Sequence, residues 1–320
     1  MITTRAVVIS APAEFALRDV VLSEPAAGDV TVETLFTSVS AGTERMLLAG
    51  RMPHPMLQFP VVPGYETVGR VAAVGPAANP ALLGQLVYVG GARCYTDVNP
   101  AWGGQAARLH ADGARVVPLG DLPAEQGVLL ALGATALHGV NLLDAALAGL
   151  AGKRVLTLGQ GPVGQFAARI AQQRGAWVAA SERTHARLAL AKADLLVDAT
   201  TEDLAARVGE PVHAIIEATG SMAALAAALP LLANDGVVLL LGYYDTIALP
   251  YMPLFLKQAR LLTAREWAAG DPARVRDLLA SGALDAAALL THRAPLADLA
   301  AAYATALEDP TCLKLVIDWR

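Results

Sequence analysis

The chain has 320 residues, of which 55% are hydrophobic and 17% charged, and its formal net charge is −5. This length is enough for two domains with large buried cores, and the apolar content excludes a disordered chain. Because the chain is mildly acidic and has no basic cluster, we do not expect it to bind nucleic acid.

The cysteines and the apolar segments limit the class of protein. The two cysteines, Cys94 and Cys312, exclude a disulfide framework and a cysteine-rich zinc site, and they favour a cytoplasmic protein. Two segments rich in Leu and Ala, 128–152 and 223–244, are interrupted by polar residues, Gly or Pro, so we expect buried elements rather than integral membrane spans. Residues 1–9 have the pattern of a strand rather than the layout of a secretory signal.

The first part of the chain, residues 1–120, has the pattern of a β-rich domain. Apolar residues alternate with others at 6–9, 30–34 and 68–74, and turns rich in Gly and Pro separate these stretches. That density of turns favours a small antiparallel or barrel-like domain rather than βαβ units.

From residue 121 to residue 265 helical patterns rich in Ala and Leu alternate with short apolar runs. The runs lie at 154–158, 177–180, 195–198, 214–217, 237–242 and 260–264. Strands separated by helices predict an α/β domain with a doubly wound parallel sheet covered on both faces. Segment 266–320 then carries two helical patterns and a final strand, at 272–281, 296–307 and 314–318.

The most specific motif lies where the strand at 154–158 meets the following helix. Gly159, Gly161 and Gly164 have the spacing G-x-G-x-x-G. The first glycine permits a tight turn, the second lets the backbone approach a pyrophosphate, and the third lets the helix pack closely on the strand. Glu182 follows the next strand, where a carboxylate can bind the adenosine ribose. The segment therefore predicts a dinucleotide-binding site.

Residues near this motif bear on the choice of cofactor. Pro162 suits the first helical position, because its missing N–H has no partner there, and Val163 begins the helical pattern. Glu182 would accept hydrogen bonds from the ribose hydroxyls and repel a 2′-phosphate, which favours NAD. Arg183 beside it would suit NADP.

Further short motifs occur in order along nearly the whole chain. They are PGYETVG at 63–69, GGQA at 103–106, TA at 135–136, GQGPVG at 159–164, EATG at 217–220 and THR at 291–293. This ordered set resembles the medium-chain dehydrogenase/reductase superfamily. The resemblance implies a Rossmann domain inserted into a partly barrel-like, GroES-like catalytic domain that segment 266–320 completes. It also implies cofactor contacts from Thr135 and Gly220.

The chain departs from the zinc-dependent branch of that superfamily. Where those enzymes carry Cys-Gly-Thr-Asp, this chain has Ala41-Gly42-Thr43-Glu44, and where they carry Gly-His-Glu, it has Gly64-Tyr65-Glu66. Residues 131–133 offer no side-chain donor in the third ligand region. Because a catalytic zinc needs about three protein ligands, the departures imply a zinc-independent member without a metal site.

Without zinc, hydrogen-bonding side chains must stabilise charge on a substrate oxygen. Tyr65 stands where the superfamily places a ligand, so its phenol could hold the substrate oxygen or relay its proton, and Thr43 could assist. Glu66 could act as a base, orient Tyr65, or pair with Arg45. His138 is a candidate proton relay near the nicotinamide.

Within the superfamily, the stretches 40–45, 50–53 and 63–66 are similar to a branch that oxidises the hydroxyethyl side chain of a bacteriochlorophyll precursor to an acetyl group. This resemblance implies NAD-dependent alcohol oxidation with a tetrapyrrole as the small-molecule substrate.

The Pro-flanked loop 51–60 suits such a broad apolar substrate, because it is expected to expose Met56 and Phe59. His54 in the same loop could ligate the central magnesium of a tetrapyrrole. Three other histidines are expected in loops or on solvated faces, namely His110, His185 and His213.

The sequence leaves two alternative functions open. One is a zinc-free quinone or enoyl reductase that uses NADPH, which Arg183 would favour. The other is a nucleotide-binding protein without turnover. The resemblance also implies a homodimer formed through the edge strand at 260–264.

Overall fold

The computed structural model describes residues 2–52 and 57–320. The chain forms two compact units. Unit 1 comprises Met1–Ala131, Arg276–Ser281 and Leu290–Arg320, and unit 2 comprises Leu132–Val275 and Gly282–Leu289. His54 and Met56 lie outside the described residues, so the expectations for them stay predictions.

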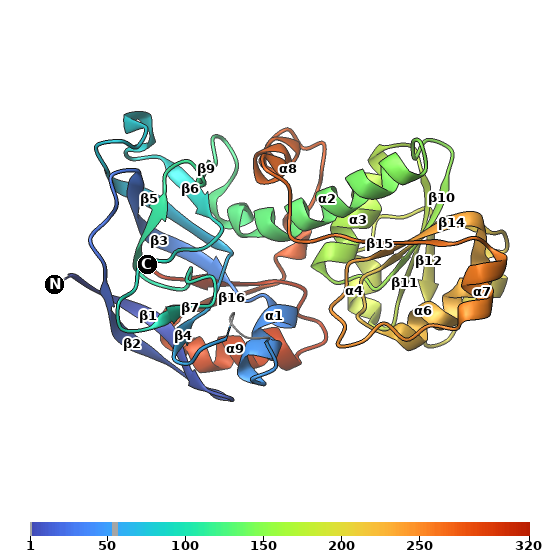
Figure 1. Cartoon of the computed structure of the whole chain (residues 1–320), viewed down its shortest axis with the longest axis horizontal. Helices are drawn as coiled ribbons and strands as arrows, with labels where there is room; N and C mark the ends of the chain where they lie inside the picture. The colour runs from blue at the N-terminus through green and yellow to red at the C-terminus, as the bar shows by residue number, and fades with distance from the viewer. Residues whose placement is uncertain (1, 53–56) are drawn as a thin grey trace. The chain divides into compact units, whose positions relative to one another are not determined.

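Unit 1 is built on two β-sheets (Figure 1). One has four strands in the order β2-β1-β4-β7, and the other has seven, in the order β16-β17-β3-β5-β6-β9 with β8 paired to β3. Their bounds are β1 Ile2–Ala11, β2 Glu14–Leu22, β3 Asp29–Ser38, β4 Val61–Val62, β5 Thr67–Val74, β6 Leu86–Val89, β7 Asn99–Pro100, β8 Arg108–Asp112, β9 Val117–Pro118, β16 His292–Pro295 and β17 Leu315–Asp318. In β3 the side chains of Val30, Val32, Thr34 and Phe36 are buried in alternation, because every second side chain of a strand faces the core.

The C-terminal segment belongs to this β-rich unit. Strand β17 pairs antiparallel with β3, and α9 (Leu299–Glu308) buries Tyr303, whose ring stacks on Phe15 with a centroid separation of 4.4 Å. Unit 1 also contains α1 (Ala41–Leu48) and the short 3-10 helices η1 (Pro80–Leu82), η2 (Ala124–Leu129) and η5 (Leu296–Asp298).

Unit 2 contains a six-stranded sheet in the order β12-β11-β10-β13-β14-β15, and all neighbouring strands are parallel. This is the order of a doubly wound dinucleotide-binding sheet, so the predicted fold class is confirmed. The strands are β10 Arg154–Leu158, β11 Trp177–Glu182, β12 Leu195–Asp198, β13 Val212–Glu217, β14 Leu232–Leu240 and β15 Arg260–Thr263.

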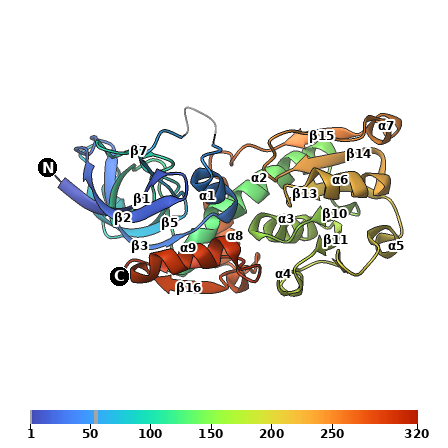
Figure 2. The same ribbon diagram turned by 90° about the horizontal axis from the view of Figure 1, so that it is seen from below.

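Helices alternate with these strands along the chain. Helix α3 contacts β10 and β11, beside which Figure 2 shows it. The helices are α2 Leu130–Ala146, α3 Pro162–Gln173, α4 His185–Ala189, α5 Leu204–Val208, α6 Met222–Ala228, α7 Tyr251–Leu256 and α8 Asp271–Ala280, with 3-10 helices η3 Leu229–Leu231 and η4 Ala287–Leu289.

The contacts divide the chain about ten residues later than the predicted boundaries after residues 120 and 265. Helix η2 packs on β3, β5 and β6, so the chain after residue 120 still belongs to unit 1. Val275 is fully buried in unit 2, where a Cβ on Gly133 would lie 2.7 Å from its side chain. Packing of apolar side chains therefore extends each unit beyond the change in sequence pattern.

The expectation that His110 lies in a loop or on a solvated face is wrong. His110 lies in β8 and is 4% exposed, and its Nδ1 is 3.0 Å from Thr31 Oγ1 on β3. Burial lowers the pKa of His110, which favours the neutral ring. It is a core histidine whose Nδ1 is hydrogen-bonded, whereas its Nε2 is buried without a hydrogen-bond partner among the described residues.

One helical stretch in the described part of the chain, Ala124–Ala146, is long and apolar enough to cross a membrane by length and composition. Of its most apolar window, 61% is buried inside the protein. A buried core helix of a folded domain can be equally long and apolar.

Candidate active site

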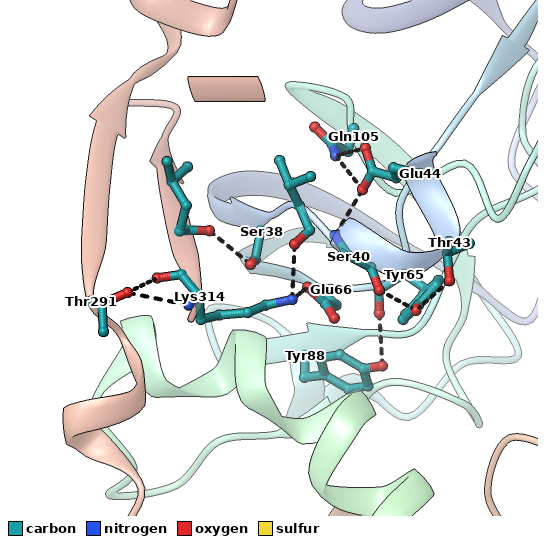
Figure 3. A network of polar contacts seen from close by, with 12 residues as sticks. Ser38, Ser40, Thr43, Glu44, Tyr65, Glu66, Tyr88, Gln105, Thr291 and Lys314 are labelled. Carbon is teal, nitrogen blue, oxygen red and sulfur yellow. Dashed lines mark hydrogen bonds and ion pairs between the residues drawn. The ribbon is translucent and has the colours of Figure 1, made fainter. Parts of the chain in front are cut away.

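Three hydroxyl groups converge in unit 1, and we call Ser40, Thr43 and Tyr65 the hydroxyl cluster (Figure 3). Tyr65 Oη lies 2.5 Å from Ser40 Oγ and 3.0 Å from Thr43 Oγ1. Ser40 precedes α1, but its side chain does not cap the helix and reaches Tyr65 instead. Tyr65 follows Gly64, whose φ of +98° turns the chain between β4 and β5. The structure thus brings two predicted site residues, Thr43 and Tyr65, together.

Glu66 is buried and pairs with a lysine that sequence reasoning missed. The Lys314 ammonium contacts the Glu66 carboxylate and donates a 3.0 Å hydrogen bond to the carbonyl oxygen of Val39. Lys314 and Glu66 are 2% and 1% exposed. The suggested pairing of Glu66 with Arg45 is wrong, because Arg45 is exposed and donates to the Leu307 carbonyl oxygen. A lysine just before an apolar final strand is a weak signal that could have pointed to this pair.

Glu44, which was not a candidate, is also buried. Its carboxylate accepts hydrogen bonds from the Ser40 backbone N–H at 3.1 Å, from Tyr303 Oη at 2.5 Å and from Gln105 Nε2 at 3.1 Å. Burial, opposed by the hydrogen bond from Tyr303 and reinforced by the negative charge of Glu66, raises the pKa of Glu44 to about 7. Glu44 therefore changes charge near neutral pH.

These charges decide what the Tyr65 phenol can do. Burial, and then the negative charge of Glu66, raise the pKa of Tyr65 above its ordinary value. The phenol therefore stays protonated at physiological pH and acts as a hydrogen-bond donor rather than as a base. Its ring also meets Trp102 edge-on, with a centroid separation of 5.3 Å, which fixes its direction.

Three described residues of unit 1 that stand where the zinc-dependent branch has its ligand motifs are poor zinc ligands. Ala41 has no donor atom, Tyr65 is a protonated phenol, and Glu66 faces the Lys314 ammonium. Within residues 2–52 and 57–320, no group of three or more His, Cys, Asp or Glu side chains is placed to hold a metal ion.

In unit 2 the glycine motif forms the turn from β10 into α3. Gly159 has a φ of +84°, and a Cβ on Gly164 would collide with the Gly159 carbonyl oxygen, so both positions need glycine. A Cβ on Gly161 would meet nothing within 4 Å. Pro162 is the first residue of α3 and Val163 follows it, as predicted.

Glu182 ends β11 beside this turn. Its carboxylate accepts hydrogen bonds from the backbone N–H groups of Gln160 at 2.7 Å, Arg183 at 2.7 Å and Thr184 at 2.9 Å. The Arg183 residue is exposed. The carboxyl ends of β10 and β11 thus bring the acidic residue and the glycine turn into direct contact, which their spacing in the sequence anticipates.

The remaining predicted site residues belong neither to the hydroxyl cluster nor to the glycine turn. Thr135 and His138 lie on α2, and His138 Nδ1 is 3.8 Å from Asp271 Oδ2. Gly220 follows β13 with a φ of +75°. Phe59 is less exposed than expected, because its side chain is partly buried against a core cluster that includes Leu47, and its contact with a substrate stays a prediction.

Models of two protein families match the chain. The alcohol dehydrogenase GroES-like domain matches residues 26–121, and the zinc-binding dehydrogenase domain matches residues 162–281. The first match falls in unit 1 and most of the second falls in unit 2.

Relatives and solved structures match over the full length. The chain is 34% identical to 2-desacetyl-2-hydroxyethyl bacteriochlorophyllide A dehydrogenase of Cereibacter sphaeroides, covering 99% of this chain and 98% of that protein. It is 33% identical to the protein of the same name from Rhodobacter capsulatus, with the same coverage. A short-chain alcohol dehydrogenase of Escherichia coli, solved with NADH, has the same fold, with a TM-score of 0.86, 19% identity and 99% of each chain covered. The chain therefore belongs to the medium-chain dehydrogenase/reductase superfamily.

Proposed function

We propose that this protein oxidises the 3-(1-hydroxyethyl) side chain of a bacteriochlorophyllide to a 3-acetyl group, with NAD as the oxidant and without a metal ion. The observation that carries the proposal is the full-length identity of 34% and 33% to two proteins named for this kind of activity. The hydroxyl cluster and the glycine motif supply the chemistry that such an oxidation needs.

The reaction removes two hydrogens from a secondary alcohol. The carbinol carbon loses a hydride, which NAD accepts when bound, and the hydroxyl oxygen loses a proton that ends in solvent. The Tyr65 phenol donates a hydrogen bond to the substrate oxygen and stabilises the negative charge that grows there. Ser40 and Thr43 hold the phenol in place through the bonds of 2.5 and 3.0 Å.

The absence of a metal in this proposal rests on the donor set of unit 1. The Lys314 ammonium already neutralises Glu66, and Ala41 and Tyr65 cannot replace thiolate or imidazole ligands. The two cysteines of the chain, Cys94 and Cys312, are both buried elsewhere.

The preference for NAD rests on Glu182. Three backbone N–H groups hold its carboxylate at the end of β11, so it cannot easily turn away from a ribose 2′-position. A 2′-phosphate would then meet a fixed negative charge. The exposed Arg183 next to it favours a second candidate function, an NADPH-dependent quinone or enoyl reductase.

One experiment separates these functions. The purified chain is incubated with NAD and the hydroxyethyl pigment, and the absorption of NADH and the long-wavelength band of the pigment are followed together. Because an acetyl group extends the conjugation, the band should shift to the red in step with NADH. The rate should be unchanged after dialysis against a chelator, and elemental analysis should find less than stoichiometric zinc.

If neither NADH nor the shift of the pigment band appears, the hydroxyethyl pigment is not the substrate. NADPH consumption with small quinones would then favour the reductase. A chelator that abolishes turnover, with zinc restoring it, would contradict the metal-free mechanism.

A further inference from the structure

The carboxylate of Glu217 is a buried group in unit 2 that the proposed reaction does not use. Glu217 is the last residue of β13 and is 0% exposed. Its carboxylate accepts hydrogen bonds from the backbone N–H groups of Thr219 at 2.7 Å and Gly220 at 3.1 Å, and from the Thr219 hydroxyl. These bonds fold the chain after β13 back onto the end of its own strand.

Tyr244 connects this carboxylate to the neighbouring strand. Its phenol donates a hydrogen bond to Glu217 and accepts one from the Gly242 N–H at 3.2 Å. The backbone N–H of Leu241 also donates to the Glu217 carbonyl oxygen at 2.8 Å. The segments that follow β13 and β14 are therefore held together by one carboxylate and one phenol. We call residues 217–220 and 241–244 the paired loops.

The paired loops leave no room for substitution at their point of contact. A Cβ on Gly242 would lie 2.6 Å from Tyr244 Oη and 2.8 Å from Glu217 Oε2. A Cβ on Gly220, whose φ is +75°, would lie 3.1 Å from the Tyr243 carbonyl oxygen. The backbone thus packs closely here, and a methyl group on Gly242 would overlap the phenol of Tyr244.

The position of the paired loops in the sheet indicates what they contact. A doubly wound sheet binds a dinucleotide at the carboxyl ends of its strands and consists of two mononucleotide-binding halves. Here the glycine turn follows β10 and Glu182 ends β11, in the half of such a sheet that takes the adenosine part of a dinucleotide. The paired loops follow β13 and β14, neighbours in the second half (Figure 2). A Cβ on Gly159 would lie 2.7 Å from the Thr219 methyl group, so they also adjoin the glycine turn.

We propose that Tyr244 is a positioning residue, which acts through Glu217 and the paired loops to fix the wall that receives the nicotinamide half of the cofactor. The inference rests on the proposed use of a nicotinamide dinucleotide. Burial, and then the hydrogen bond to Glu217, raise the pKa of Tyr244, so the phenol remains a donor over the working pH range.

The test compares two ligands that differ in the nicotinamide alone. The full-length chain and its Tyr244→Phe variant are titrated with NADH and with ADP-ribose, which lacks the nicotinamide ring. A lost hydrogen bond to a buried carboxylate should weaken NADH binding about tenfold. The dissociation constant for ADP-ribose should change less than twofold, as expected for a substitution that does not affect binding. Tyr251→Phe, which removes an exposed phenol on α7, is the matched control and should change neither affinity.

A second variant keeps the inference testable should Tyr244→Phe not fold. Glu217→Gln retains the size of the side chain but weakens the same bonds, and it should also lower the affinity for NADH selectively. Equal losses for NADH and ADP-ribose, or no loss for either, would overturn the role of Tyr244. A wild-type chain that binds neither ligand would instead overturn the dinucleotide assignment itself, and this inference with it.

Discussion

Burial raises the pKa of Glu44 to about 7, and the hydrogen bonds from Tyr303 and Ser40 and the charges of Glu66 and Lys314 also act on it. At the scale of residues, chemistry here depends on which carboxylates are charged. Glu66 has a lysine partner, whereas Glu44 is held by neutral donors. The phenol of Tyr65 lies close to both and remains protonated.

The titration of Glu44 predicts a pH-dependent stability. In the unfolded chain its pKa is near 4.5, so between pH 4.5 and about 7 the folded protein holds a proton that the unfolded chain has lost. The stability that this proton gives is complete below pH 4.5 and is lost as the pH rises through 7. The loss amounts to about 3 kcal/mol.

Glu44→Gln should abolish this loss. We expect the free energy of unfolding of the wild type to fall, relative to the variant, by about 3 kcal/mol between pH 4.5 and pH 8. Denaturant titrations at several pH values measure it, and Glu14→Gln, at an exposed position, is the control. Parallel pH curves for wild type and Glu44→Gln would show that Glu44 does not titrate in this range.

Tyr65→Phe tests the proposed donor to the substrate oxygen. Removal of one such donor should lower kcat about 10²–10³-fold, while the dissociation constant for NADH should stay the same because the phenol belongs to unit 1. Steady-state kinetics with the hydroxyethyl pigment and a separate binding titration measure the two effects. Tyr95→Phe, whose phenol donates to the Gly103 carbonyl oxygen, should retain kcat. Unchanged turnover in Tyr65→Phe would remove this residue from the mechanism.

At the scale of elements, the turn from β10 into α3 follows from local sequence. A glycine with positive φ ends the strand, Pro162 starts the helix, and Gly164 lets the first turn of the helix approach the Gly159 carbonyl oxygen. The three glycines nevertheless have different functions, since the space around Gly161 is open. A substitution at Gly164 should therefore affect the stability of the fold, whereas one at Gly161 should affect ligand binding.

Two alanine variants test that difference. Gly164→Ala should lower the free energy of unfolding by about 1–3 kcal/mol because of the overlap with Gly159. Gly161→Ala should leave the unfolding temperature unchanged but weaken dinucleotide binding about tenfold or more, because the added methyl group would occupy space needed by the pyrophosphate. Thermal unfolding and NADH titration measure these effects. A Gly161→Ala protein with wild-type affinity would contradict the assigned site.

At the scale of the whole molecule, unit 2 has an exposed apolar helix, α7, followed in the sequence by the edge strand β15. Strand β15 pairs with β14 on one side and ends the sheet. In α7, the side chains of Tyr251, Met252, Phe255 and Leu256 are exposed, from 54% for Met252 to 69% for Leu256. Such a surface favours association with a second copy of the chain.

We therefore expect a homodimer in solution. Phe255→Glu should give a monomer because it places a charge on the apolar face, and light scattering coupled to size exclusion measures the mass. Leu196→Glu, on the opposite edge strand β12, is the control and should remain dimeric. A monomeric wild type would refute the expectation.

Sequence by itself determined the features that depend on neighbours along the chain. The strand, the glycine turn, the start of α3 at Pro162 and the acid at the end of β11 lie within thirty residues. Their types and spacing specify backbone conformation directly, so they predicted the dinucleotide motif. The alternation of helical patterns and apolar runs over residues 121–265 predicted the parallel sheet. Ordered motifs likewise predicted the superfamily.

Tertiary structure alone decided the partners of the buried charged groups. Lys314 reaches Glu66 and Tyr303 reaches Glu44, each from the C-terminal segment, and Tyr244 reaches Glu217 from the segment that follows the neighbouring strand β14. The same is true of His110, which became a core residue when β8 paired with β3. Hydrogen bonds and ion pairs of this kind depend on which elements pack together, and no periodicity in the sequence encodes that choice. The ionisation of the site residues, which sets their chemistry, is therefore a property of the folded chain.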